Sequence, residues 1–213
     1  MTLPCWWQQS APWRGEQGWY RASQAPVPLV EGRAFCFCGG CVGSRKRVNE
    51  MGLEAVTIRL VEPRDQEAIA RMWEALSAYH TRLDSRMPRA AAGAPAAYAS
   101  RLIEVRSDAE TRAFVAEVEG AVVGYVLGAV VDLTPDLFEH EDVGFIADIY
   151  VEPDYRRRGI ARQLFNAICD WFAAQGVRHV EWQVAVANAE ARRFWEAVGG
   201  RGLTMRMRLS RPK

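Results

Sequence analysis

The sequence lacks the features that mark several classes of protein. Its 213 residues contain no apolar run of the ~18 residues that a membrane-spanning helix needs, so we expect no membrane segment. Neither sign of charge dominates: 27 Lys and Arg against 26 Asp and Glu leave a net charge of +1, which does not favour binding to nucleic acid. The start of the chain lacks the basic and apolar regions of a secretory signal, so we expect a cytoplasmic protein.

Cysteine is scarce after residue 41. Cys5, Cys36, Cys38 and Cys41 precede it and only Cys169 follows, so the main body has no disulfide framework. The early cluster could form a small zinc site, but it lacks the two closely spaced ligand pairs that such sites usually show. We therefore expect no metal. Residues 1–50 show no sustained hydrophobic period, and we interpret them as an N-terminal extension that is disordered or non-native, with a metal-binding role as the weaker alternative.

Residues 51–213 are expected to form the folded domain. Alternating or apolar runs predict strands at 56–61, 114–118, 122–131, 143–151, 180–186 and 203–209. Helical spacing predicts helices from residue 63, over 96–105, over 158–174 and after residue 188. The resulting order, β-α-α-β-β-β-α-β-α-β, indicates an α/β (α+β) fold with a mixed, mostly antiparallel sheet flanked by helices.

A basic segment joins a strand to a helix at residues 151–161, VEPDYRRRGIA. Backbone N–H groups converge at the start of a helix, where the dipole is positive, so a turn of this kind can bind an anion. Gly159 would let a ligand approach the backbone, and Arg156, Arg157 and Arg158 are suited to phosphate. The alternative is a solvent-exposed basic helix start, but three cations there oppose the helix dipole unless a polyanion binds. Neither a P-loop nor a dinucleotide-binding fingerprint is present.

Two segments together resemble the GNAT superfamily of acyl-CoA-dependent N-acetyltransferases. The family pattern is a strand ending in Val, four residues, and R/Q-x-x-G-x-G/A; here it is Val151 followed by residues 156–161, RRRGIA. The second family segment, N-x-x-A-x-x-F-Y-E-x-x-G-F, appears as NAEARRFWEAVGG at 188–200. The element order matches the family over residues 51–213, and the extension has no counterpart in it.

The resemblance implies a binding mode for acetyl-CoA. The backbone N–H groups from Arg157 to Arg162 would hold the pyrophosphate, the strand around Ile149 to Val151 would pair with the pantetheine, and Asn188 would contact its far side. The full set of expected cofactor-binding residues is Ile149, Tyr150, Val151, Arg156, Arg157, Arg158, Gly159, Ile160, Ala161, Arg162, Asn188 and Trp195. The expected partners are acetyl-CoA and an amine acceptor, either a small molecule or a protein amine, which would attack the thioester directly in a ternary complex; a homodimer is left open.

The sequence departs from the family at two positions. Trp195 stands where many members have a Tyr proposed to protonate the leaving thiolate, and an indole is no practical acid at neutral pH. Polyamine acetyltransferases have a Glu-Asp pair in the strand of residues 143–151, where this chain has Ala147 and Asp148. We expect an acetyltransferase, and these departures motivate the alternative, a non-catalytic acyl-CoA-binding regulatory domain.

Asp148 is the candidate catalytic residue. An amine must lose a proton before it attacks a thioester, and a carboxylate inside an apolar strand is costly unless it faces a cleft or is paired. Its alternative role is a structural hydrogen bond to a neighbouring loop. His80 and Asp84 follow the first helix, where the fold usually forms a wall of the acceptor cleft. His80 could relay protons there, but a surface or helix-end role is slightly favoured. Cys169 has apolar helical neighbours and is expected to be structural.

The connection at 132–142 is rich in acidic residues. We interpret it as a solvated loop. It would favour a cationic acceptor if it overhangs the cleft.

Overall fold

The computed structural model describes residues 55–209. The chain separates into two units, residues 1–53 and 54–213. The extension with its early cysteines lies outside the described residues, so the domain boundary expected at residue 50 stays a prediction.

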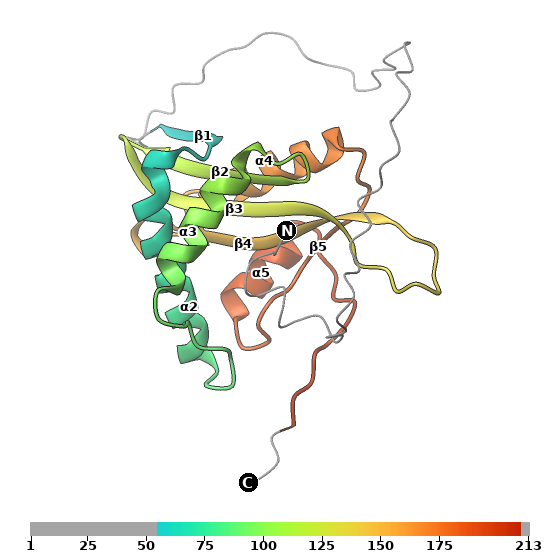
Figure 1. Ribbon diagram of the computed structural model, residues 1–213. Helices are drawn as coiled ribbons and strands as arrows, with labels where there is room; N and C mark the ends of the chain where they lie inside the picture. Colours follow the sequence, from blue (N-terminus) through green and yellow to red (C-terminus); the bar gives the residue numbers. More distant parts are fainter. Residues whose placement is uncertain (1–54, 210–213) are drawn as a thin grey trace, which may run out of the picture. The chain divides into compact units, whose positions relative to one another are not determined.

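A five-stranded sheet forms the centre of the fold (Figure 1). Its strands are β1 (Val56–Leu60), β2 (Thr111–Val118), β3 (Ala121–Asp132), β4 (Asp142–Val151) and β5 (Val180–Trp182). They lie in the order β1-β2-β3-β4-β5, and every pair is antiparallel except the parallel pair β4–β5. The expected mixed, mostly antiparallel sheet is confirmed. The hairpin between β2 and β3 turns through Glu119 and Gly120, both with positive φ, as two-residue hairpin loops of this twist require.

Helices cover both faces of the sheet (Figure 1). A short 3-10 turn, η1 (Pro63–Asp65), leads into α2 (Gln66–Leu83), and α3 (Ala94–Glu104) ends in a second turn, η2 (Val105–Ser107). These helices lie on one face. On the other face, η3 (Pro153–Tyr155) precedes α4 (Ile160–Ala174), and α5 (Ala189–Ala197) follows β5. The flanking helices are therefore also as expected.

The core between α4 and the sheet follows the apolar period of the sequence. Ile160, Leu164, Ile168 and Phe172 recur every fourth residue and are each at most 1% exposed. The Phe172 ring lies directly against β4 at Gly144, where an added Cβ would come within 2.6 Å of its Cγ. Glycine at this position thus permits the close approach of helix and sheet.

The C-terminal part of the chain differs from expectation. The strand predicted at 203–209 does not form: residues 201–209 have no regular structure, and Leu203, Met205, Met207 and Leu209 are 68–86% exposed. Alternation marks a segment able to form a strand, but no neighbouring strand pairs with it among the described residues. β5 likewise stops at Trp182 instead of residue 186, because the chain there turns away from β4.

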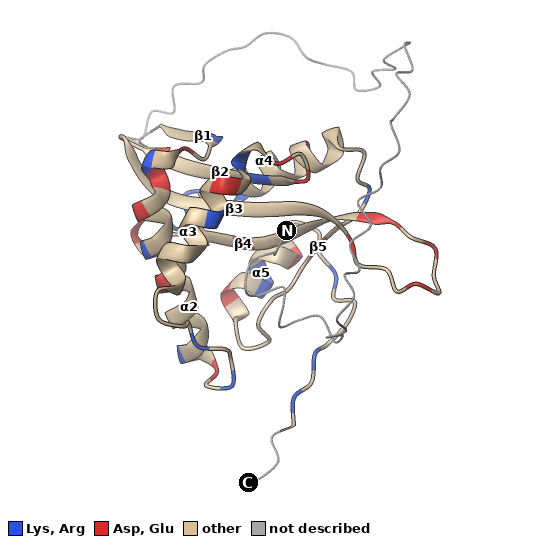
Figure 2. Ribbon diagram, in the orientation of Figure 1, with Lys and Arg blue, Asp and Glu red and all other residues tan. Residues whose placement is uncertain are grey.

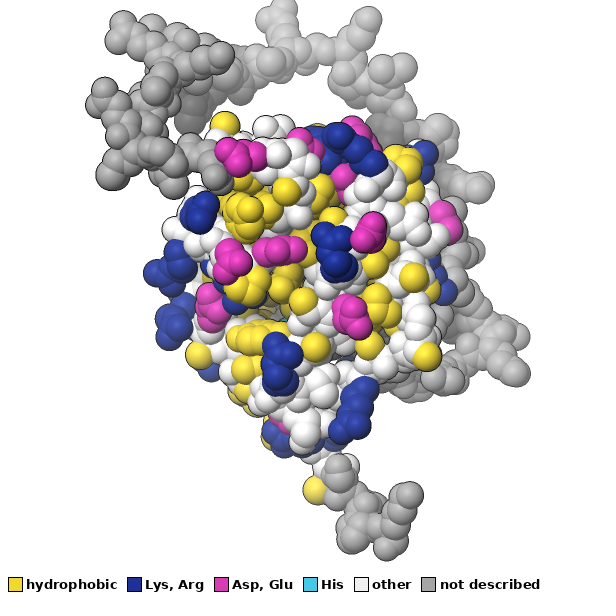
Figure 3. All heavy atoms as spheres, turned by 90° about the vertical axis from the view of Figure 1, so that its left-hand side faces the viewer, with side chains coloured by type: hydrophobic (Ala, Val, Ile, Leu, Met, Phe, Trp, Pro, Cys, Tyr) yellow, Lys and Arg dark blue, Asp and Glu magenta, His cyan; other side chains and the backbone are white. Residues whose placement is uncertain are grey.

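Charge is dispersed over the surface. Acidic side chains follow the loop between β3 and β4, which extends away from the sheet (Figure 2). On the face presented by α2 and α3, acidic and basic side chains alternate with apolar ones (Figure 3). Within residues 55–209, no helix has the length and apolar character needed to cross a membrane.

Candidate active site

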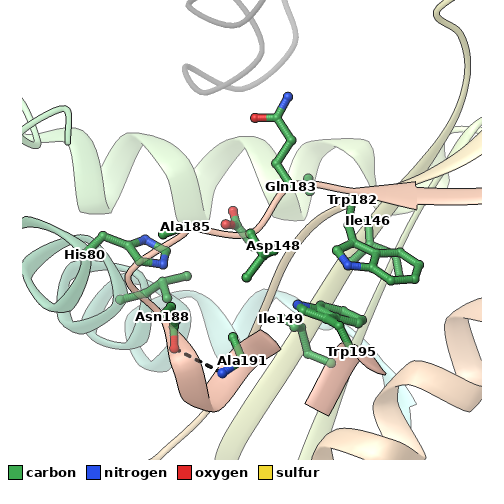
Figure 4. Close-up of a pocket in the computed structure, with 13 residues that line it drawn as sticks. His80, Ile146, Asp148, Ile149, Trp182, Gln183, Ala185, Asn188, Ala191 and Trp195 are labelled. Atoms are coloured by element: carbon green, nitrogen blue, oxygen red, sulfur yellow. Dashed lines mark hydrogen bonds between the residues drawn. The ribbon is translucent and has the colours of Figure 1, made fainter. Parts of the chain in front are cut away.

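A pocket opens where β4 and β5 part. The two strands pair only between residues 144–146 and 180–182, after which β4 continues alone and the chain after Trp182 leads away toward α5. Side chains from β4, from the segment after β5, from α5 and from the end of α2 surround the gap (Figure 4). They are Leu76, His80, Ile146, Ala147, Asp148, Ile149, Trp182, Gln183, Val184, Ala185, Asn188, Ala191 and Trp195.

A bulge in β4 turns Asp148 toward this pocket. Leu127 of β3 lies opposite Asp148, whereas the next β3 residue, Gly128, lies opposite Ile146, so Ala147 is an extra residue without a partner on β3. In a regular strand, residues 146 and 148 would point to the same face. Here Ile146 packs into the core beneath α4, while Asp148 points to the face covered by α2 and α3.

Asp148 pairs with Tyr98, and the surroundings of the two polar groups are otherwise apolar. Its carboxylate is half-buried, and its Oδ2 accepts a hydrogen bond of 2.8 Å from the hydroxyl of Tyr98 on α3. Burial raises the pKa of Asp148 from the ordinary 3.8 to about 7, against the smaller lowering effect of the Tyr98 hydrogen bond. Asp148 therefore makes a structural hydrogen bond, to a helix instead of the expected loop, and also faces the pocket. Such a carboxylate can exchange a proton near neutral pH.

The end of α2 brings one of its two candidate residues to the site. His80 lines the pocket and points into it together with Asp148 (Figure 4). Burial lowers the pKa of His80, so the imidazole is neutral at physiological pH. Asp84 does not line the pocket; it binds the guanidinium of Arg86 at 2.7 Å, which lowers the pKa of Asp84 to about 2.

The turn before α4 has the backbone geometry of an anion site. Arg157 and Gly159 both adopt left-handed conformations, with φ of 63° and 80°, and no side chain caps the start of α4. Left-handed residues in a turn can direct neighbouring N–H groups to one side of the chain, where they can face an anion. A Cβ at Gly159 would meet no protein atom within 4 Å. The backbone angle therefore favours glycine here, and the space beside it is open to a ligand.

The arginines of this turn have different surroundings. Arg156 is held in place: its Nε donates to the Val151 carbonyl at 3.0 Å, and its guanidinium lies over the Tyr150 ring. Arg157 and Arg158 are exposed, and Arg158 lies over the ring of Tyr155.

The expected cofactor-binding residues near α5 and β4 are only partly in the pocket. Asn188 lines it and caps α5, accepting a hydrogen bond of 3.0 Å from the Ala191 N–H (Figure 4). Ile149 also lines it, whereas Tyr150 and Val151 do not. Ile160, Ala161 and Arg162 form the first turn of α4, away from the lining; Arg162 donates to the Ala197 carbonyl.

Trp195 forms one wall of the pocket. It is 7% exposed, and its ring stacks on Trp182 with centroids 4.4 Å apart. The ring of Phe165 packs edge-on against Trp195 at 5.9 Å. The indole is thus a packed part of the wall.

Sequence reasoning missed several residues at the site. Tyr98 is absent from the expected set because its partner lies 50 residues away, and its helix shows only an ordinary apolar stripe. Trp182, Gln183 and Leu76 line the pocket without belonging to a motif. Trp182 alone had a signal, as a large aromatic residue within the strand predicted at 180–186. Within residues 55–209, no group of three or more His, Cys, Asp or Glu residues is arranged to hold a metal ion.

Comparison with known proteins identifies the family. The model of the acetyltransferase (GNAT) family matches residues 69–199, which is more than half of the chain. The chain belongs to the GNAT family. Its matched segment contains Asp148, the turn before α4 and α5, so the resemblance drawn from the two motifs is confirmed.

Individual relatives match over a shorter length. An uncharacterized N-acetyltransferase of Methanocaldococcus jannaschii is 36% identical over 40% of this chain and 37% of its own length. An aminoglycoside N(6')-acetyltransferase type 1 of Salmonella typhimurium is 26% identical over 40% of this chain and 59% of its own. The chain thus spans less than two thirds of the length of these curated relatives.

Solved structures agree with the GNAT fold. A mutant of a Bacillus halodurans protein superposes with a TM-score of 0.66 at 24% identity, covering 73% of this chain and 99% of that one. An aminoglycoside N-acetyltransferase bound to the bisubstrate analogue CoA-S-monomethyl-acetylneamine superposes with a TM-score of 0.55 at 20% identity, covering 75% and 99%. At these identities the likeness establishes the fold.

Proposed function

We propose that this GNAT protein transfers the acetyl group of acetyl-CoA to a primary amine by direct attack in a ternary complex. The observation that carries the proposal is Asp148, a carboxylate with a pKa of about 7, turned by a bulge into the pocket between the parting strands. Family membership supplies the reaction class, and the site geometry supplies the proton acceptor.

Two parts of the fold, the turn before α4 and the unpaired end of β4, fit a coenzyme A molecule. The turn with left-handed Arg157 and Gly159 leads into the uncapped start of α4, which suits a pyrophosphate. Past Ile146, β4 has no β5 partner, so its backbone groups beside Ile149 can pair with an amide-containing chain such as pantetheine. Acetyl-CoA, when bound, supplies the acetyl group as an activated thioester.

Asp148 is suited to accept the proton of the amine. A primary ammonium has a pKa near ~10.4, about 6.6 units above an ordinary carboxyl but only about 3.4 units above Asp148. Since each unit corresponds to about 1.36 kcal/mol, burial makes the transfer less unfavourable by about 4 kcal/mol. The neutral amine can then attack the carbonyl carbon of the thioester.

No covalent enzyme intermediate is needed. Burial, the largest cause, and the nearby Asp170 raise the pKa of Cys169 to about 11. The thiol packs at the edge of the core beneath α4 and does not line the pocket. A thiol in this environment is a poor nucleophile at neutral pH, which favours direct attack.

The departing thiolate takes its proton from water in this proposal. Trp195 cannot act as an acid, and no tyrosine is among the pocket-lining residues of the described chain. Trp195 and Trp182 instead form an apolar wall that excludes solvent from one side of the cleft.

The acceptor is proposed to present one amine to the pocket. Asp148 is the only carboxylate among the lining residues, which otherwise are apolar, aromatic, amide or imidazole groups. The acidic residues of the loop between β3 and β4 do not line it, so the described part of the site has no feature that selects a polycation. The acceptor is therefore a primary amine of a small molecule or of a protein.

The Asp148→Asn variant tests the proposal. It should lower kcat/KM for acetylation of an amine panel by roughly 10²- to 10⁴-fold, measured as thiol release, while calorimetry finds unchanged CoA affinity. Asp84→Asn is the matched control, because Asp84 lies outside the pocket, and it should retain activity. The rival function, a non-catalytic acyl-CoA-binding domain, is motivated by Trp195 and Ala147; it would be supported if the wild type bound CoA but acetylated no amine in the panel.

A further inference from the structure

The side chain that contacts Asp148 is itself held rigidly. Tyr98 is 7% exposed and projects from α3 beside the buried residues Ala99 and Leu102. Its ring stacks on Trp73 of α2, with centroids 5.2 Å apart and planes inclined by 22°. The Tyr125 ring of β3 lies 6.2 Å away on another side. Packing from two helices and the sheet therefore determines where the Tyr98 hydroxyl lies.

The Tyr98 hydroxyl hydrogen-bonds to one of the two carboxylate oxygens of Asp148. It donates to Oδ2 of Asp148 at 2.8 Å, and Oδ1 has no hydrogen-bond partner among residues 55–209. The carboxylate also lines the pocket. With Oδ2 held from the side of α3, Oδ1 is the oxygen left to meet a group in the pocket.

The hydroxyl is a permanent donor. Burial and the neighbouring Asp148 charge raise the pKa of Tyr98 well above 10, so the phenol keeps its proton at neutral pH. Tyr98 does not line the pocket, so it is not placed to protonate a leaving group there. What it can do is stabilise the ionised form of Asp148 and fix the plane of the carboxylate.

We propose that Tyr98 is a positioning residue for the transfer reaction: its hydroxyl holds Oδ2 of Asp148 so that Oδ1 faces the pocket and accepts the proton of the amine. This inference rests on the proposed role of Asp148 as base. It assigns a role in the reaction to α3, which contributes no side chain to the pocket lining.

The decisive experiment compares two tyrosine variants by a titration that needs no acceptor. Carbon-13 NMR of protein with labelled aspartate carboxyls reports the Asp148 titration directly, and loss of the resonance in Asp148→Asn assigns it. In Tyr98→Phe, which removes only the hydroxyl, the midpoint should rise from about 7 by roughly one to two pH units, because a hydrogen bond to the charged form is lost.

Tyr125→Phe is the matched control. Tyr125 is also buried and lies against Tyr98, but its hydroxyl makes no hydrogen bond to Asp148. Removing it should leave the Asp148 midpoint within about 0.3 units of the wild type. Equal shifts in both variants would mean that general polarity sets the midpoint, and would overturn the inference, as would an unchanged midpoint in Tyr98→Phe.

Kinetics then separate this inference from the proposed function. In Tyr98→Phe the acidic limb of the kcat/KM profile should move with the NMR midpoint, lowering kcat/KM roughly 5- to 50-fold at pH 7 and leaving CoA affinity unchanged. If the hydrogen bond were purely structural, its loss in Tyr98→Phe would lower stability without moving the acidic limb of the kcat/KM profile. If the midpoint shifts but the limb does not, Asp148 is not the base, and the proposed function loses its proton acceptor. If the acidic limb of the wild-type kcat/KM profile follows the Asp148 titration but Tyr98→Phe does not move the Asp148 midpoint, only the positioning role of Tyr98 fails.

Discussion

Replacing Asp148 by Asn should stabilise the fold at alkaline pH while it disables the proposed reaction. The pKa of Asp148 is about 7 in the fold, against an ordinary 3.8. Between these values the folded protein keeps a proton that the unfolded chain has released, so the carboxylate makes stability fall as the pH rises from about 4 to 7. Above pH 7 both states are ionised and the loss is complete. Asn carries no charge and avoids this loss.

The magnitude follows from the difference between the two pKa values. About three units at about 1.36 kcal/mol each give up to about 4 kcal/mol at pH 8. The Tyr98 hydroxyl can still donate to the Asn oxygen, so the hydrogen bond is retained. For a chain of this length the gain corresponds to a rise in Tm on the order of 10 °C.

Urea denaturation from pH 4.5 to 8.5, followed by circular dichroism, measures the effect. The stability of Asp148→Asn minus that of the wild type should grow with pH and level off above 7. Asp84→Asn is the control: the pKa of Asp84 is lowered to about 2, so its contribution is present above about pH 4 and is lost only in stronger acid. The effect of that substitution should be flat over the measured range. An Asp148→Asn protein that is less stable at pH 8, or a difference independent of pH, would refute the reasoning.

Sequence reasoning succeeded where one local pattern determines the structure. The four apolar residues of α4 recur every fourth position, and all lie in the core beneath the sheet. Glu119-Gly120 between two apolar runs predicts the hairpin that β2 and β3 form. The turn at 156–159 likewise combines a strand end, a glycine and a helix start, and the structure gives Arg157 and Gly159 left-handed backbone angles; its role as an anion site stays a prediction.

The parts that sequence could not give depend on contacts between distant segments. Ala147 has nothing in its residue type that marks a bulge, because the bulge exists only in the register with β3. Alternation alone therefore does not tell which face Asp148 occupies. The strand expected at 203–209 failed for a related reason: an alternating pattern shows that a segment can pair, but not that a partner is available. Tyr98 meets Asp148 only after α3 has packed on the sheet.

Three further changes test the rest of the site and the chain organisation. Gly159→Glu should abolish CoA binding in calorimetry, because it places a carboxylate in the open space beside the turn that precedes α4. Gly176→Glu is the control for backbone strain. Gly176 has the same φ within a degree and equally open surroundings, so this variant should bind CoA normally. A chain beginning at Met51 should keep its melting temperature and CoA affinity, and loss of folding, or stoichiometric zinc in the full chain, would contradict our interpretation of residues 1–50 as dispensable. Trp195→Tyr should leave kcat equal or higher, because a phenol can supply the proton that an indole cannot. The smaller ring gives up part of the stacking on Trp182, so stability should fall by about 1 kcal/mol. A folded Trp195→Tyr protein with lower kcat and unchanged CoA affinity would show that the indole wall, and not a missing acid, determines the rate of transfer.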